Sequence, residues 1–233
     1  MNLIEKAVKW VKDRVLLANT LYFPGCLTHF VLSDKEDSYK KILNELGIEY
    51  IFIPEFNCCG SPVLHAGYKK DFNDLKKKNF ELFRKYGVGK IITNCPGCYM
   101  ILSKEYGLKV EHISQVLAKN LDKVNKKFDG DVTYHDPCHL GRKSSNIYNE
   151  PRIVLAKLGL NIEEFPKNRE RSLCCGAGGG LRNNYRELAD KIAKERLRLV
   201  KTKRLVTTCP MCYKHFLENS KDIEVKEFSE FLI

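Results

Sequence analysis

The sequence lacks a long uninterrupted hydrophobic segment. Its longest uncharged stretch runs from Val15 to Ser33, and Asn19, Pro24 and His29 are among the residues that interrupt it. A helix that crosses a bilayer needs about 20 mostly apolar residues, so we predict no membrane span. The first 17 residues, MNLIEKAVKWVKDRVLL, place a charge every few positions and contain no apolar core of the kind found in signal peptides. We therefore expect a cytoplasmic protein.

The usual nucleotide-binding motifs are also absent. The sequence contains no P-loop and no dinucleotide fingerprint, and the run GAGGG from Gly176 to Gly180 lacks the fingerprint's spacing and lies inside a cysteine motif. The compact C-x2-C-x2-C run of ferredoxins is missing as well. We therefore predict no site for a nicotinamide or deazaflavin donor.

The charge is unbalanced but dispersed. Lys and Arg number 40 against 29 Asp and Glu, which gives a formal net charge of +11. A basic protein can bind nucleic acid, but these side chains, such as Lys69, Lys70, Lys76 and Lys85, are spread along amphipathic segments and are not interleaved with aromatics. With 43% apolar and 30% charged residues, the composition is that of a soluble globular protein with no nucleic-acid partner.

Cysteine is what the sequence has in abundance. Ten cysteines form two sets of five, each with the pattern C…CC-G…C-P-x-C, and none is left over: Cys26, Cys58, Cys59, Cys95 and Cys98, then Cys138, Cys174, Cys175, Cys209 and Cys212. Matching cysteines are 112, 116 and 114 positions apart, which indicates a duplicated unit. Disulfides are rare in the cytoplasm, so metal or redox chemistry is expected.

Alternating β-rich and helical segments predict an α/β fold of two tandem units, each a small parallel sheet with flanking helices. Residues 1–19 are predicted as an N-terminal helix, 20–125 as the first unit and 126–233 as the second, with the polar segment Lys119–Asp131 linking them. Expected strands cover residues 21–23, 48–53, 91–93, 108–113, 132–135, 162–165, 205–208 and 223–228. One helix is expected to open with a capping box, Ser33 to Glu36, and to close at Gly47, and another to end at Gly87.

Every cysteine group follows an expected strand and precedes a helix. Three loops of each unit should therefore meet at the carboxyl edge of its sheet, where open α/β sheets place their ligands. A zinc site usually takes four ligands from two knuckles, whereas each half has one. Cys95 and Cys98 alone would suit a dithiol redox motif. Two adjacent thiolates, as in Cys58-Cys59, suit an assembly of several irons.

These motifs resemble the CCG-domain (cysteine-rich domain) family. The resemblance covers roughly residues 20 to 217 and rests on YFPGC at 22–26, NCCG at 57–60, CPGC at 95–98, HDPCHLGR at 135–142, CCGAGGG at 174–180 and CPMC at 209–212. The family includes the catalytic iron-sulfur subunits of heterodisulfide reductase and related subunits of glycolate, lactate and glycerol-3-phosphate oxidising complexes. It implies a four-iron cluster in each half, non-cubane in some members, with all ten cysteines as ligands and zinc as an option in one half.

Some residues beside the ligands are candidates for further roles. Disulfide reduction consumes protons, so His135 and His139, which flank Cys138, are predicted proton donors, either of which could instead make a supporting hydrogen bond. His29 and His65 are weaker candidates. The arginines of the second motif either attract an anionic substrate or an acidic partner, or are simply solvated: Arg142, Arg169, Arg171 and Arg182.

The leading hypothesis is an oxidoreductase subunit with two four-iron clusters that reduces a disulfide or relays electrons. One alternative is an iron-sulfur partner of a flavin-dependent hydroxy-acid dehydrogenase, and another is a zinc-stabilised binding module. Electrons would arrive from a flavoprotein or ferredoxin-type subunit, and a small disulfide or thiol would be the substrate.

Overall fold

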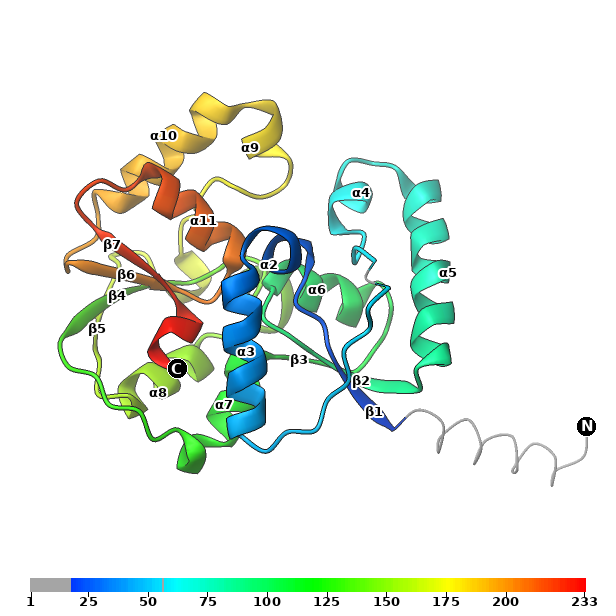
Figure 1. Ribbon diagram of the computed structural model, residues 1–233. Helices are drawn as coiled ribbons and strands as arrows, with labels where there is room; N and C mark the ends of the chain where they lie inside the picture. Colours follow the sequence, from blue (N-terminus) through cyan, green and yellow to red (C-terminus); the bar gives the residue numbers. More distant parts are fainter. Residues whose placement is uncertain (1–17, 56) are drawn as a thin grey trace, which may run out of the picture.

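The computed structural model describes residues 18–55 and 57–233 (Figure 1). The helix predicted at the N-terminus falls almost wholly outside these residues, and Asn19 already belongs to the first strand. Two parallel sheets lie side by side, with the first half of the chain on the right of Figure 1 and the second half on the left. The predicted α/β architecture of two duplicated parallel sheets is confirmed.

The first half contains three strands and six α-helices among the described residues. In chain order they are β1 (Asn19–Tyr22), α2 (Cys26–Val31), α3 (Ser33–Glu45), α4 (Ser61–His65), α5 (Lys69–Lys85), β2 (Val88–Thr93), α6 (Pro96–Lys104), β3 (Val110–His112) and α7 (Ile113–Lys119), followed by the 3-10 turn η1 (Leu121–Lys123). The predicted helix ending at Gly87 is α5, which buries Phe72, Asn79 and Phe83.

The second half repeats this order. It runs through β4 (Asp131–His135), the π-helical turn η2 (Gly141–Ser145), α8 (Asn149–Lys157), β5 (Asn161–Glu164), η3 (Arg169–Arg171), α9 (Leu181–Asn184), α10 (Arg186–Leu197), β6 (Arg204–Thr207), α11 (Pro210–Asn219), β7 (Glu224–Glu227) and η4 (Phe228–Phe231). All four strands predicted for this half are present.

The two sheets have equivalent strand orders with one exception. The second sheet has the order β5-β4-β6-β7, and the first has β1-β2-β3. The strand predicted over residues 48–53 is wrong, because only Ile51 pairs with Leu21, through a single parallel bridge. This segment lies at the sheet edge and runs into Pro54, which has no N–H to continue a ladder. Ile51 therefore stands where β5 stands in the second half.

The capping box predicted at Ser33 is also wrong. The N-cap residue of α3 is Leu32, and no side chain caps the helix, because the backbone N–H groups of Lys35 and Glu36 donate to the Leu32 carbonyl as the chain turns directly out of α2. The Glu36 carboxylate instead lies 2.7 Å from His29 Nδ1. Capping boxes that were not predicted occur after β3, at His112, and after β7, at Glu227.

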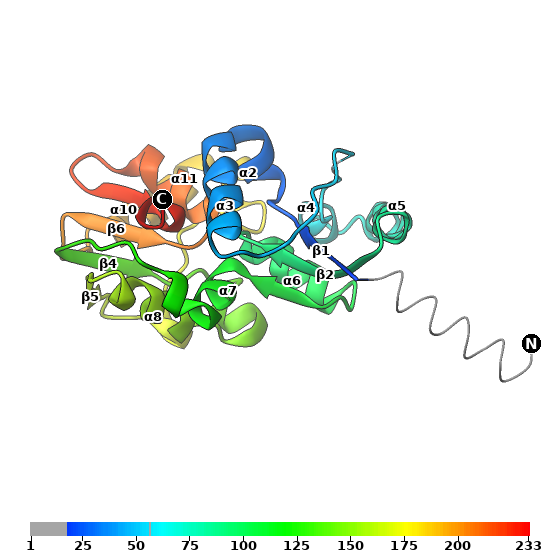
Figure 2. The ribbon, with the colours of Figure 1, turned by 60° about the horizontal axis from the view of Figure 1, so that its bottom comes forward.

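A hydrophobic core shared by both halves joins the sheets. One buried cluster contains Tyr22, Tyr39 and Ile92 from the first half and Tyr134 and Phe228 from the second. Helices α3 and α7 of the first half pack on η4 and α8 of the second half, respectively (Figures 1 and 2). These contacts hold the carboxyl edges of the two sheets in a fixed arrangement.

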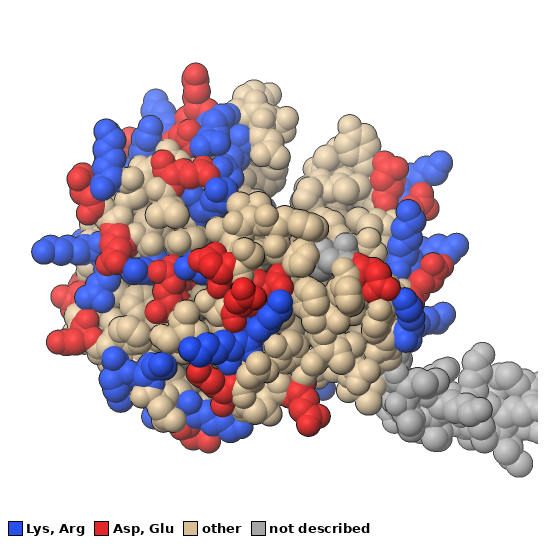
Figure 3. All heavy atoms as spheres, viewed as in Figure 1, with Lys and Arg blue, Asp and Glu red and all other residues tan. Residues whose placement is uncertain are grey.

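The surface in Figure 3 carries basic and acidic side chains intermingled over most of the second half. Between α9 and α4 the same view shows a hollow whose visible walls are uncharged. None of the helices in the described part of the chain is both long and apolar enough to span a bilayer.

Candidate metal centres

The three cysteine loops of each half converge at the carboxyl edge of its sheet, as predicted. Cys26 begins α2 in the short loop after β1, and Cys95 is the N-cap of α6 shortly after β2. Cys58 and Cys59 come between the Ile51 bridge and α4. Proline at the first position of α6, where its missing N–H costs nothing, lets the helix begin at once after the strand.

In the first half the sulfur atoms are close together. Cys98 Sγ lies 3.3 Å from Cys59 Sγ, and both side chains are buried. Cys26 hydrogen-bonds to Cys58, and Cys26, Cys58 and Cys95 are half-buried. All five cysteines are free thiols, so the set combines a buried side with a side that solvent can reach.

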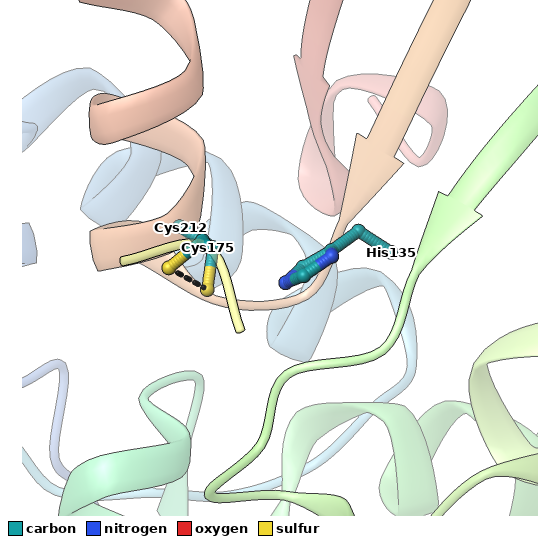
Figure 4. Close-up of side chains that lie close together, drawn as sticks. All are labelled: His135, Cys175 and Cys212. Carbon is teal, nitrogen blue, oxygen red and sulfur yellow. Dashed lines mark hydrogen bonds between the residues drawn. The ribbon is translucent and has the colours of Figure 1, made fainter. Parts of the chain in front are cut away.

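The second half has the same arrangement. Cys212 Sγ lies 3.2 Å from Cys175 Sγ (Figure 4), both side chains are buried, and Cys138 hydrogen-bonds to Cys174. The backbone N–H of Gly176 donates to Cys174 Sγ at 3.4 Å, as that of Gly60 does to Cys58 Sγ at the same distance. One difference is that Cys209 is buried, whereas its counterpart Cys95 is half-buried.

Glycine at these positions permits the close approach. Gly60 and Gly176 have φ angles of +87° and +92°, in the left-handed region that side chains disfavour. At Gly25 a Cβ atom would lie 3.1 Å from Cys98 Sγ. Gly25 therefore leaves room beside the sulfurs, whereas Gly60 and Gly176 let the double-cysteine loops pack closely on α5 and α10.

In each half the first thiol of the double cysteine has a lowered pKa, and in the first half that of Cys95 is lowered too, chiefly by the Cys98 thiol. The pKa of the Cys58 thiol falls to about 3, because the thiols of Cys26 and Cys59 and the Gly60 N–H donate to it. The pKa of Cys174 is lowered in the same way by Cys138, Cys175 and Gly176. Because thiolates are the metal-binding form of cysteine, each set is prepared to bind metal.

The donor sets fit iron-sulfur clusters, which are held by thiolates and stabilised by N–H donors to sulfur. In each half five sulfurs and the backbone N–H donor of a glycine meet at one sheet edge. That all ten cysteines act as ligands is a proposal that rests on this convergence.

The two predicted proton donors have different surroundings. His135 is completely buried, neither ring nitrogen has a hydrogen-bond partner among the described residues, and burial lowers its pKa to about 3. A ring nitrogen of His135 and the sulfurs of Cys175 and Cys212 all lie within 4.8 Å of one another (Figure 4). His135 is therefore a neutral imidazole directed at the second set of sulfurs.

His139 is half-buried, and its Nδ1 is 3.4 Å from Cys138 Sγ. Its ring contacts that of His65, from the other half, with 6.1 Å between ring centroids. Burial lowers the pKa of His139 to about 4. His65 also hydrogen-bonds to Ser61, and His29 pairs with Glu36. Proton delivery stays a prediction, with His139 at the more accessible position.

Three of the four arginines of the second motif contact other protein groups. Arg142 donates to the Ser172 carbonyl, Arg169 is 3.7 Å from Glu164, and Arg182 pairs with Glu218. Arg171 is exposed. Sequence reasoning missed Arg196, a buried arginine on α10, and the role of Asn79, whose amide donates to the Cys58 carbonyl at 3.0 Å. The available signal was a polar residue on an otherwise apolar helix face.

Known proteins share this pattern. A family model described as "Cysteine-rich domain" (CCG) matches residues 20–103 and again 132–217. The chain is 36% identical over 222 residues to an uncharacterised iron-sulfur protein of Methanococcus maripaludis, covering 90% of this chain and 44% of that protein. It is 32% identical to one of the subunits of the dihydromethanophenazine:CoB–CoM heterodisulfide reductase of Methanosarcina acetivorans, covering 94% and 60%.

A further relative is one of the subunits of the CoM/CoB fumarate reductase of Methanothermobacter marburgensis, at 33% identity with 91% of this chain and 45% of that protein covered. The chain thus spans between 44% and 60% of the length of these three relatives. Their names refer to iron-sulfur or oxidoreductase proteins, and none supports the zinc option.

Proposed function

Because the chain belongs to the CCG family of cysteine-rich domains, we propose that it is the iron-sulfur subunit of an oxidoreductase and that it reduces a disulfide substrate. The observation that carries this proposal is the convergence of five sulfurs at each of two sheet edges. In each half the five cysteines hold one four-iron cluster, which supplies electrons one at a time at a fixed place in the chain.

The arrangement of the two halves supports a shared substrate site. The double cysteines lead into α4 and α9, the helices on either side of the hollow in Figure 3. The contact between His65 and His139 brings the same two halves together beside the ligands. A small disulfide bound in this hollow would lie between the two sets of cysteines.

The overall reaction needs two electrons and two protons for each disulfide, and it yields two thiols. We expect the electrons to come from a flavoprotein or ferredoxin-type subunit, since the sequence offers no nucleotide-binding motif of its own. His139 could pass a proton to the departing thiolate. His139→Gln should then slow thiol release with the iron content unchanged, and His65→Gln serves as its control. Equal rates in the two variants would remove this role.

The proposal is tested with chemically reduced protein from which excess reductant has been removed. A mixed thiol disulfide should reoxidise it and release two thiols per disulfide, measured by thiol titration alongside the return of visible absorption. Unreduced protein mixed with reduced nicotinamide should not bleach. If no disulfide reoxidises protein with intact clusters, the chain is an electron relay, as in the hydroxy-acid dehydrogenase alternative.

A further inference from the structure

The two sites have equivalent cysteines but different side chains beside them. Tyr22 and Tyr134 stand at matching positions, because the hydroxyl of the first hydrogen-bonds to Asn94 at 3.1 Å and that of the second to Thr208 at 2.9 Å, each just before the C-P-x-C motif. The next residue is Phe23 in the first half and His135 in the second. An imidazole thus replaces a phenyl ring beside the second set of sulfurs.

Two aromatic rings fix the position of the His135 side chain. It packs edge-to-face on Phe216, with ring centroids 4.8 Å apart, and on Phe165, at 6.4 Å. Both of its nitrogens are buried and have no partner among the described residues, yet a neutral imidazole carries one N–H donor that is costly to bury unpaired. Figure 4 shows the ring directed at Cys175 and Cys212. A sulfur acceptor of a bound cluster would satisfy it.

A second matched pair lies on the helices behind the double cysteines. Gly60 faces Phe72 and Leu75 of α5, and Gly176 faces Ala189 and Ile192 of α10. Phe72 and Ala189 are 117 positions apart in the sequence, and so are Leu75 and Ile192. The same offset places Arg196 at the position that corresponds to Asn79. The uncharged Asn79 amide donates to the Cys58 carbonyl and to Tyr106 Oη. A guanidinium therefore replaces an amide at this position, and it packs on Phe165, the ring that also contacts His135.

The charge of Arg196 is not neutralised locally. The side chain is 2% exposed, its guanidinium lies 3.5 Å from the centroid of the Phe165 ring, and Nη2 donates to the Lys167 carbonyl at 3.1 Å. Nε and Nη1 have no partner, and no carboxylate among the described residues lies within 4.0 Å. Asp136, the acid that faces this region, is already bound by Arg152 and by the Arg169 N–H.

We propose that His135 and Arg196 give the second site the higher reduction potential of the two. The first electron that the chain accepts would then reduce the site in the second half. This inference rests on the proposed function, because it presupposes a cluster in each half. Reduction adds negative charge, which hydrogen bonds to sulfur and a nearby buried cation stabilise. Phe23 and the already bonded amide of Asn79 offer the first site neither.

The deeper burial of one cysteine in the second half has the opposite effect on the reduction potential of that site. Cys209 is 8% exposed while Cys95 is half-buried, and loss of solvent disfavours added charge. An uncompensated cation in a medium of low dielectric constant acts more strongly than this difference at one of five ligands. The second site therefore keeps the higher reduction potential.

The test is an anaerobic potentiometric titration of the full chain reconstituted with iron-57, followed by Mössbauer and electron paramagnetic resonance spectroscopy. Cys58→Ser and Cys174→Ser protein provide the spectra of the individual sites. In the wild type the second site should be reduced first. In His135→Phe, the ratio of reduced to oxidised second site at a fixed potential should fall about tenfold, equivalent to about 59 mV for one electron.

Three further variants, one of them a control, keep the proposal falsifiable if His135→Phe fails to fold. Phe23→His should raise the potential of the first site. Arg196→Asn should lower that of the second, and Arg198→Asn, at an exposed position on the turn that ends the same helix, should leave both unchanged. Iron content should stay at the wild-type value throughout, because neither His135 nor Arg196 is a ligand.

Equal potentials in the wild type, or unshifted potentials in His135→Phe and Arg196→Asn protein with full iron, would overturn the inference. Loss of iron from the second site of His135→Phe would also overturn it, by making His135 a ligand. A wild-type chain without clusters would instead overturn the proposed function.

Discussion

The two halves of this chain place five cysteines each in nearly the same way but surround them with different residues. The close sulfur pairs differ by only 0.1 Å, at 3.3 Å for Cys59–Cys98 and 3.2 Å for Cys175–Cys212. Phe23 and Asn79 in the first half correspond to His135 and Arg196 in the second. We infer that the cysteine pattern would determine where a cluster is held, whereas the neighbouring residues that are not ligands would determine the charge balance around it.

The largest expected effect separates the two ligand sets. Cys174→Ser should lose about four of about eight irons and leave the spectrum of the first site intact, and Cys58→Ser should do the reverse, because each half supplies its own ligands. Iron analysis and visible absorption of the two variants measure this. A single substitution that removed both clusters from a folded chain would show that ligands are shared between the halves.

A smaller effect sharpens the comparison of the double-cysteine loops. Gly60→Ala and Gly176→Ala both force alanine into the left-handed region, at about 1–2 kcal/mol each. The added Cβ would lie 2.7 Å from the Phe72 side chain in the first case and 2.8 Å from the Ala189 backbone oxygen in the second. A ring can turn aside, but helix backbone cannot.

Gly176→Ala should therefore lower the free energy of unfolding by about 1 kcal/mol or more beyond Gly60→Ala, as measured by urea unfolding. Iron content must be compared first, so that cluster loss is not counted as loss of fold stability. An equal or larger effect of Gly60→Ala would contradict this account of the loops.

An effect of comparable size concerns His112. This residue lies at the end of β3, and its counterpart at the end of β7 is Glu227. His112 is fully buried, its Nε2 is 3.2 Å from the Asn94 carbonyl oxygen, and burial lowers its pKa from 6.5 to about 4. The unfolded chain binds this proton below pH 6.5, so the stabilising contribution is complete above that pH and is lost as pH falls.

Between pH 7.5 and 5.5 the free energy of unfolding should fall by about 1.4 kcal/mol more in the wild type than in His112→Gln. Urea unfolding at the two pH values measures the difference, and the other buried histidines contribute to both proteins alike. The stability contribution of Glu227 depends on pH in the opposite way. Burial raises the pKa of this carboxyl group, so its contribution to the free energy of unfolding is lost as pH rises. Identical slopes in the two proteins would show that His112 titrates normally.

Much of the fold was predictable because strong local signals agreed with it. The duplicated cysteine spacing, the β-rich runs and the apolar face of α5 predicted two parallel sheets with ligands at their carboxyl edges. The segment 48–53 failed as a strand because an edge position next to Pro54 allows one bridge only. Ser33 failed as a capping residue because α2 leads straight into α3.

Sequence reasoning could not predict contacts that depend on how the halves meet. Tyr39 of α3 donates to Glu227 at 2.7 Å across 188 positions of sequence, and no local pattern encodes that distance. Arg196 and Asn79 lie on buried helix faces, so the contact of Arg196 with Phe165 and that of Asn79 with the Cys58 carbonyl became visible only in the structure.

The central claim is that each half holds its own four-iron cluster, and metal analysis of the anaerobically purified chain tests it most directly. The account predicts about eight irons and eight inorganic sulfides per chain, with Mössbauer spectra that assign the iron to two four-iron sites. Stoichiometric zinc in a colourless protein, or loss of all the iron from a folded chain on changing one cysteine of either half, would contradict it.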